Sequence, residues 1–184
     1  MLRTFLKAGI DKLEKTWSYD ASYMRYVLQH SPGSLLKFTF VTGMADRRAA
    51  PREALAAAGI AGTLLEDCGP CTQIGVDMAA AGGVDPKVLR AILAGDEAAM
   101  GETAALAWRF ARASLARDMA EADPLRDEIV RRWGDAALVA ISLSITTGRM
   151  YPTLKYALGY GKACSRVVVA GEPTPVLHAP ALAA

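Results

Sequence analysis

Hydrophobic residues recur along most of the chain with the 3.6-residue period of an amphipathic helix. Over residues 2–17 the apolar stripe consists of Leu2, Phe5, Leu6, Ile10, Leu13 and Trp17. Similar patterns predict further helices over 21–30, 51–65, 86–93, 102–118, 124–132, 135–147 and 152–163. The pattern therefore predicts an all-α fold.

Several of these helices have recognisable ends. Three prolines suit the first position of a helix: Pro51, Pro86 and Pro124. Asp85 and Asp123 precede the last two, and their carboxylates can cap free amide groups. Gly134 follows Trp133 and predicts a helix end there.

Two stretches do not fit the helical pattern as clearly. LLKFTFVTG, after the turn Ser31-Pro32-Gly33, suits a strand as well as a buried helix because it is rich in aromatic and β-branched residues. The chain from Ala170 onward has three prolines and no periodicity. We therefore expect a single helical domain over 1–169 and an irregular tail over 170–184.

Composition excludes several classes of function. The 184 residues are 52% hydrophobic and 22% charged, which fits one globular domain. Lysine and arginine (21) are scattered and barely outnumber aspartate and glutamate (19), so we expect no nucleic-acid partner. The longest apolar run, 136–147, is shorter than the roughly 20 residues of a membrane span. The first 17 residues carry charges where a signal peptide is apolar, and we expect a cytoplasmic protein outside the membrane.

The candidate chemistry lies in the cysteines. The chain has three cysteines, too few for a disulfide scaffold, and Cys68 and Cys71 form a C-x-x-C pair. Such a pair is redox-active, binds a metal, or simply packs in the core. A structural zinc site needs four ligands, and only Cys164, His30 and His178 remain to supply the others. We expect no metal and no organic cofactor.

The tetrapeptide CGPC is also the spelling used by thioredoxins, whose pair follows a central strand. Here the preceding AGIAGTLLED is alanine-rich and helical in period, so the pair is expected between two helices. Amide groups at a helix N-terminus stabilise a thiolate, and sulfurs one turn apart can close a disulfide. By position alone, Cys68 is nearer the helix end and is expected to be the more exposed and acidic thiol.

The stretch LLEDCGPCTQIGVDMAAAGGVDPKVLRAILAGDE resembles the carboxymuconolactone decarboxylase and alkylhydroperoxidase D (AhpD) superfamily. The likeness lies in a helix, a C-x-x-C at the start of the next helix, a Val-Asp-Pro turn and a helical hairpin. It implies an AhpD-like homo-oligomer that reduces hydroperoxides or disulfides and is re-reduced by an external thiol. It also implies that Cys71 attacks peroxide and that Cys68 resolves the product. The decarboxylase branch typically lacks the C-x-x-C.

The sequence departs from that family beside the cysteines. The position of the family's histidine, one turn after the second cysteine, is Gly75, and the position of its glutamate is Ala56. The residues that share the helix face of Cys71 are all apolar or small: Ile74, Gly75, Met78 and Ala79. Asp77 lies about 120° around the helix from Cys71 and is expected to point elsewhere. A thiol in such surroundings has a raised pKa, and peroxide turnover would be slow.

Gly75 leaves space for a base from another segment. The candidates are Glu53, Glu66, His30 and Arg149, and the first two are favoured because they lie on the preceding helix and beside Cys68. Each has a simpler reading, with Glu53 as a solvated helix charge and His30 as a cation at a helix C-terminus.

Two functions from different classes therefore stand. One is a thiol peroxidase or thiol–disulfide oxidoreductase that uses Cys68 and Cys71. The other is a catalytically lapsed helical oligomer, in which the small and apolar residues around Gly75 line a pocket for a hydrophobic molecule. Cys164 is expected to be a packed small hydrophobe, and Trp108, Phe110 and Trp133 to be core or interface residues.

Overall fold

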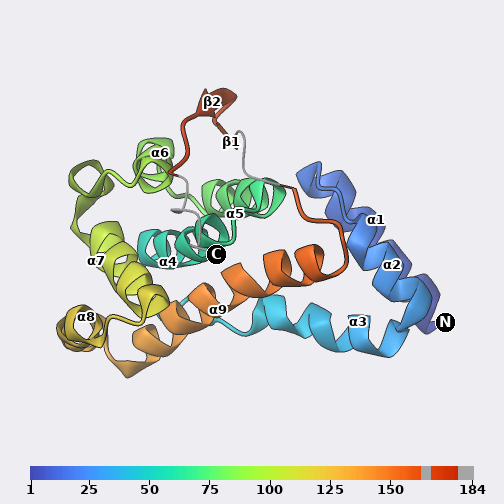
Figure 1. The fold of residues 1–184 in the computed structure, drawn as a ribbon, viewed down its shortest axis with the longest axis horizontal. Helices are drawn as coiled ribbons and strands as arrows, with labels where there is room; N and C mark the ends of the chain where they lie inside the picture. The colour runs from blue at the N-terminus through green and yellow to red at the C-terminus, as the bar shows by residue number, and fades with distance from the viewer. Residues whose placement is uncertain (163–166, 178–184) are drawn as a thin grey trace.

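The computed structural model describes residues 1–162 and 167–177, and nearly all of its regular structure is helical (Figure 1). The helices are α1 (Leu2–Trp17), α2 (Ser22–His30), α3 (Pro32–Thr39), the 3-10 helix η1 (Phe40–Gly43), α4 (Arg52–Leu65), α5 (Gly69–Ala81), α6 (Pro86–Ala94), α7 (Glu97–Ala116), α8 (Met119–Trp133) and α9 (Asp135–Ala157). The strands described are β1 (Val167–Val169) and β2 (Glu172–Thr174), which pair antiparallel. The predominantly helical class agrees with the prediction, and no thioredoxin-like central sheet occurs in these ranges.

Two hydrophobic clusters hold the helices together. The larger is centred on α4, α6, α7 and α9, with Ile60, Leu89, Trp108 and Ile141 fully buried. The smaller joins α1, α2 and α3 to the C-terminal end of α9. In Figure 1, α1–α3 occupy one end of the molecule, α6–α8 the other, and the long α9 runs between them. α9 therefore connects the two clusters.

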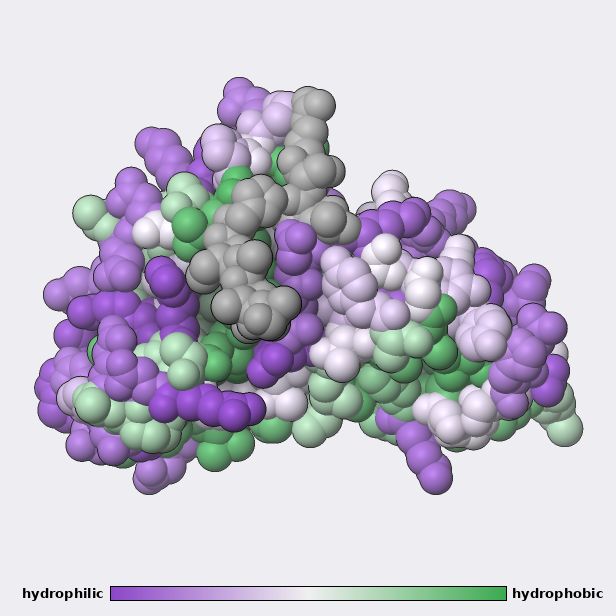
Figure 2. Space-filling view, in the orientation of Figure 1, coloured by the Kyte–Doolittle hydropathy of each residue, from purple (hydrophilic) through white to green (hydrophobic). Residues whose placement is uncertain are grey.

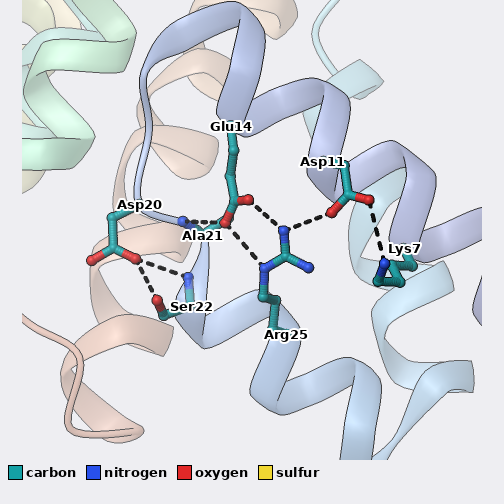
Figure 3. A network of polar contacts seen from close by, with 7 residues as sticks. All are labelled: Lys7, Asp11, Glu14, Asp20, Ala21, Ser22 and Arg25. Atoms are coloured by element: carbon teal, nitrogen blue, oxygen red, sulfur yellow. Dashed lines mark hydrogen bonds and ion pairs between the residues drawn. The ribbon is translucent and has the colours of Figure 1, made fainter.

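A polar network fixes the turn between α1 and α2 (Figure 3). Arg25 of α2 lies 2.6 Å from the Asp11 carboxylate and also contacts that of Glu14, both on α1. Glu14 in turn accepts a hydrogen bond from the backbone N–H of Ala21, at 3.3 Å. Since these groups are partly exposed, the ion pairs themselves contribute little to stability. Their main effect is to fix the α1–α2 turn, which carries Tyr19.

α4 and α9 cross at backbone contact. A Cβ atom on Gly148 of α9 would overlap the carbonyl oxygen of Gly59, and one on Gly62 would lie 2.9 Å from that of Ile145. Glycine is needed at Gly62 and Gly148 because no side-chain atom fits between the two helices. The crossing fixes α4, which leads directly to the cysteine pair.

The ambiguous stretch LLKFTFVTG is helical, forming the end of α3 and all of η1. It buries Leu35 against α1 and α2, which explains the apolar composition without a partner strand.

Two predicted boundaries are wrong. α8 begins before Pro124, because the Asp118 carboxylate caps it by accepting from the N–H of Glu121 at 3.2 Å. The predicted helices 135–147 and 152–163 are one helix, α9, which continues through Pro152 and ends at Ala157. A further helix, α7, starts at Glu97 and has a break at Gly101 (φ 74°), so its second part agrees with the prediction of 102–118.

The expectation of an irregular tail is wrong for residues 172–174. These pair with β1 through a turn at Ala170 and Gly171, whose positive φ values suit a tight hairpin. Val167 and Val169 are buried against the main cluster. Gln73 of α5 joins the hairpin, donating to the carbonyl of Val168 at 2.9 Å and accepting from its N–H at 2.7 Å. The amide of Gln73 thus acts as a third partner of the hairpin.

The surface is mixed in character (Figure 2). On the face shown, hydrophilic residues cover most of the end formed by α6–α8, and hydrophobic residues gather toward α2 and the end of α9. None of the helices within the described ranges is long and apolar enough to cross a membrane.

Candidate functional site

Cys68 and Cys71 lie at the start of α5 and are joined by a disulfide, with their Cα atoms 5.3 Å apart. Cys68 is the N-cap residue, and Pro70 occupies the first turn, where its missing N–H costs nothing. The preceding segment is helix α4, which agrees with the predicted helix and excludes the strand that precedes the pair in thioredoxins. A turn with Asp67 in the left-handed region (φ 47°) connects the two helices.

The two cysteines differ in their surroundings. Cys68 is 0% exposed. Its N–H faces the Thr63 carbonyl at 3.4 Å, and the next amide, of Gly69, donates to the Lys162 carbonyl at 3.2 Å. Cys71 is 3% exposed and lines a cavity that is partly open to solvent, whereas Cys68 is not among the lining residues. The expectation that Cys68 would be the more exposed thiol is therefore wrong.

The cavity has a volume of about 370 Å³ and lies among α4, α5, α9 and the α1–α2 segment. Its wall is mostly apolar, with side chains such as Leu13, Met24, Leu55, Ile60 and Val84. Polar groups on the wall include three tyrosines, Tyr19, Tyr23 and Tyr151, and two arginines, Arg47 and Arg52. A space of this size and character suits a small, largely apolar molecule.

The face of α5 that carries Cys71 opens onto this cavity as predicted, because Ile74, Gly75, Met78 and Ala79 all line it. A Cβ atom at Gly75 would meet only Ile60 Cγ1, at 3.9 Å. Ala56 lines the same cavity. Gly75 and Ala56, the positions of the family's histidine and glutamate, therefore both line the cavity, but neither carries a titratable group.

The predicted carboxylates have partners elsewhere. Glu66 is paired with Arg149 (Oε1 to Nε 2.6 Å), and the Thr153 hydroxyl lies 3.5 Å from its other oxygen. Glu53 is paired with Arg52, at 3.2 Å. Neither carboxylate is among the residues that line the cavity. The structure thus brings Cys71 and Gly75 together but does not bring Glu53 or Glu66 to them.

Two other candidates also lie away from the cavity. His30 is in the last turn of α2 and packs against the Tyr26 ring at 4.5 Å, in agreement with a helix-end role. Asp77 accepts a hydrogen bond from Gln73 at 2.8 Å, and burial raises the pKa of its carboxyl group. As expected, Asp77 does not face the side of α5 that carries Cys71.

A cluster that the sequence pattern does not reveal lies at the tyrosine side of the cavity. Lys155 of α9 is 2% exposed, and its Nζ lies 4.9 Å and 5.3 Å from the ring centroids of Tyr19 and Tyr23. The same Nζ lies 3.4 Å from the Tyr19 hydroxyl, which in turn lies 3.5 Å from that of Tyr23. No carboxylate forms a salt bridge with Lys155 within the described ranges, so the two rings supply its closest stabilisation.

Burial favours the neutral form of each member of this cluster and shifts its pKa accordingly. It lowers the pKa of Lys155 below the ordinary value, and the nearby Asp20 carboxylate opposes that effect. It raises the pKa of Tyr19 to about 12 and raises that of Tyr23 further. Both tyrosines therefore stay protonated at neutral pH. The periodic pattern could not reveal the cluster, because positions 19 and 155 meet only in the folded chain.

In the part of the chain that the structure describes, no group of three or more His, Cys, Asp or Glu side chains could hold a metal ion. Cys164 and His178 lie outside the described residues. No family model, curated protein or solved structure matches the chain. Any functional assignment therefore depends on the site itself.

Proposed function

We propose that this chain is a thiol-dependent redox protein that reduces hydroperoxides or disulfides through Cys68 and Cys71. The observation that carries the proposal is the asymmetry of the pair, in which Cys71 lines a cavity and is bonded to a fully buried Cys68. In this proposal Cys71 reacts with substrate and Cys68 resolves the product. The position of the pair at the start of α5 favours the thiolate form through the helix dipole.

The chemistry balances without a metal or an organic cofactor. The Cys71 thiolate attacks the terminal oxygen of a hydroperoxide, the O–O bond breaks, and Cys71 sulfenic acid and an alkoxide form. The Cys68 thiol then attacks the sulfenic sulfur, which closes the disulfide and releases water. Two equivalents of an external thiol reduce the disulfide and are themselves oxidised to a disulfide.

The resemblance of residues 64–97 to the AhpD superfamily supports the same proposal. The order helix, C-x-x-C, helix in α4 and α5 is the arrangement on which that resemblance depends. An AhpD-like bundle assembled into a cytoplasmic homo-oligomer is part of the proposal. With Glu53 and Glu66 held in ion pairs, Cys71 lacks an adjacent carboxylate, and slow turnover is expected.

A second candidate function is binding of a hydrophobic small molecule without catalysis. It is favoured by the apolar character of the cavity and by Gly75, which leaves the space beside Cys71 open. In that case the cysteines would be a structural disulfide.

Site-specific alkylation of the reduced native protein distinguishes the two. In a Cys164→Ser background only Cys68 and Cys71 can react, and peptide mapping assigns the product. A redox site predicts that a small alkylating agent modifies Cys71 in the native protein and Cys68 only after unfolding. Cys68→Ser and Cys71→Ser are matched controls. If both thiols stay unmodified until the protein unfolds, the redox proposal is wrong and the binding function remains.

A further inference from the structure

Cleavage of a hydroperoxide needs an acid as well as a thiolate. The alkoxide that leaves is a strong base, and protonating it in the transition state accelerates such steps by about 10²–10⁴-fold. The described residues that line the cavity include no histidine, aspartate or glutamate. The lining side chains that can donate a proton include three tyrosines, Tyr19, Tyr23 and Tyr151.

Tyr19 and Tyr23 are on that wall and form a continuous chain with a buried cation. Lys155 Nζ lies 3.4 Å from the Tyr19 hydroxyl, and the Tyr19 hydroxyl lies 3.5 Å from that of Tyr23. An ammonium group can only donate, so Lys155 donates to Tyr19, and Tyr19 can then donate to Tyr23. A tyrosine that accepts a hydrogen bond still has its own proton to donate, and Tyr23 is part of the cavity wall.

We propose that Tyr23 is the proton donor of this cavity and that Tyr19 and Lys155 supply and orient its proton. The proposal depends on the redox function proposed above. Tyr23 is assigned as the catalytic acid because it lines the cavity and is the last group of the hydrogen-bonded chain. Lys155 does not line the cavity and is a positioning residue that acts through Tyr19. The buried ammonium polarises the chain, and the low-dielectric surroundings strengthen that effect.

The protons balance along this chain. When Cys71 sulfur takes the terminal oxygen of the hydroperoxide, the remaining alkoxide takes the Tyr23 proton and leaves as an alcohol. Tyr23 is reprotonated from Tyr19, and Tyr19 from the Lys155 ammonium, which recovers a proton from solvent. No oxidant other than the hydroperoxide is required. A substrate whose leaving group is already a weak base does not need this proton.

That difference provides the test. In a Cys68→Ser, Cys164→Ser background Cys71 is the sole thiol, and its loss is followed by mass spectrometry. tert-Butyl hydroperoxide releases a strongly basic alkoxide, whereas methyl methanethiosulfonate releases a weakly basic sulfinate. Both reactions use the Cys71 thiolate, so the ratio of their rates does not depend on the fraction of Cys71 that is ionised. Tyr23→Phe removes one oxygen atom from the chain, and Tyr26→Phe, outside the cavity lining, is its matched control.

Tyr23→Phe is expected to slow the hydroperoxide reaction about 10²-fold and to leave the thiosulfonate reaction unchanged, while Tyr26→Phe changes neither. A ratio that is the same in Tyr23→Phe and the parent overturns the relay and leaves the redox function standing. If Cys71 in the parent reacts with neither reagent, the redox function itself is wrong. An unchanged thiosulfonate rate also shows that the variant has folded.

The pH dependence tests the role of Lys155. The groups around it are Tyr19, Asp20 and Tyr23 from the α1–α2 segment, with Lys162 farther along the chain. Tyr151, on the same helix as Lys155, interacts with the two tyrosines. As pH rises and Lys155 loses its proton, the ratio of hydroperoxide rate to thiosulfonate rate should fall in the parent. In Lys155→Met the ratio should be low and independent of pH over that range. A fall that persists in Lys155→Met overturns its part in the relay.

Discussion

The contact between α4 and α9 predicts that alanine at Gly148 destabilises the protein. In an isolated helix, replacing an internal glycine by alanine stabilises by about 0.5–1 kcal/mol. At Gly148, however, the new Cβ would overlap the carbonyl oxygen of Gly59 and lie 3.3 Å from its carbonyl carbon. These are backbone atoms, so the two helices have to move apart.

Overpacking of this kind costs about 3 kcal/mol at the upper end of its range, and the helix preference returns about 1 kcal/mol, so we expect a net loss of about 2 kcal/mol. For a chain of this length that corresponds to a melting temperature about 4–8 °C lower. The measurement is urea denaturation and thermal unfolding, followed by far-UV circular dichroism.

Gly59→Ala is the matched control from the same crossing. Its Cβ would meet only the Ser144 carbonyl oxygen, at 3.7 Å, which is an ordinary contact. We expect this variant to be more stable than the parent by about 0.5–1 kcal/mol. If both substitutions stabilise the protein equally, the helices do not approach as closely as described, and the reasoning on the crossing is refuted.

Three further predictions concern other parts of the molecule. Asp118→Ala removes the α8 cap and should lower the free energy of unfolding by about 1 kcal/mol in denaturant. Asp123→Ala removes only an exposed contact to Arg126 and should change it by less than about 0.5 kcal/mol. Equal losses would contradict the helix start at Asp118. Lys155 has a lowered pKa in the folded state, so the unfolded chain binds more protons and stability should rise with pH from that lowered pKa toward 10.5. Lys155→Met should abolish this rise in unfolding curves measured at several pH values. The same rise in the variant would contradict the burial of the Lys155 charge. Gly75→His should speed oxidation of Cys71 by hydroperoxide about tenfold or more, because the new imidazole has room beside the thiol and can act as its base. Gly9→His, on exposed α1, should have no effect on that rate. Equal rates in both variants would show that Gly75 does not face Cys71.

Local sequence patterns predicted much of the helical structure. The apolar stripe of residues 2–17 is α1, and the helix face around Cys71 lines the cavity as the period of α5 requires. Both depend on spacing within one helix, which the sequence contains directly. Pro124 was misleading as a helix start, because it lies inside α8. The break expected between residues 147 and 152 is absent, because α9 continues through Pro152.

The features that the sequence pattern did not predict depend on contacts between distant segments. Cys68 was expected to be the more exposed thiol, yet it is fully buried, and the backbone beside it is hydrogen-bonded to Lys162, far along the chain. The hairpin at β1 depends on Gln73, almost a hundred residues earlier in the chain. The cluster of Lys155 with Tyr19 and Tyr23 likewise joins the two ends of the sequence. No periodicity in a single segment carries such information.

The central claim is that Cys71 reacts with substrate and Cys68 resolves the product. The most direct test is a thiol count by intact mass after the reduced native protein and its Cys71→Ser variant have each been exposed to an organic hydroperoxide and then alkylated. The claim predicts that the parent loses two alkylatable thiols as the Cys68–Cys71 disulfide forms. The variant is predicted to form no disulfide and to keep Cys68 as an alkylatable thiol. If both proteins retain all their thiols over the time in which a control thiol peroxidase is fully oxidised, the claim is contradicted.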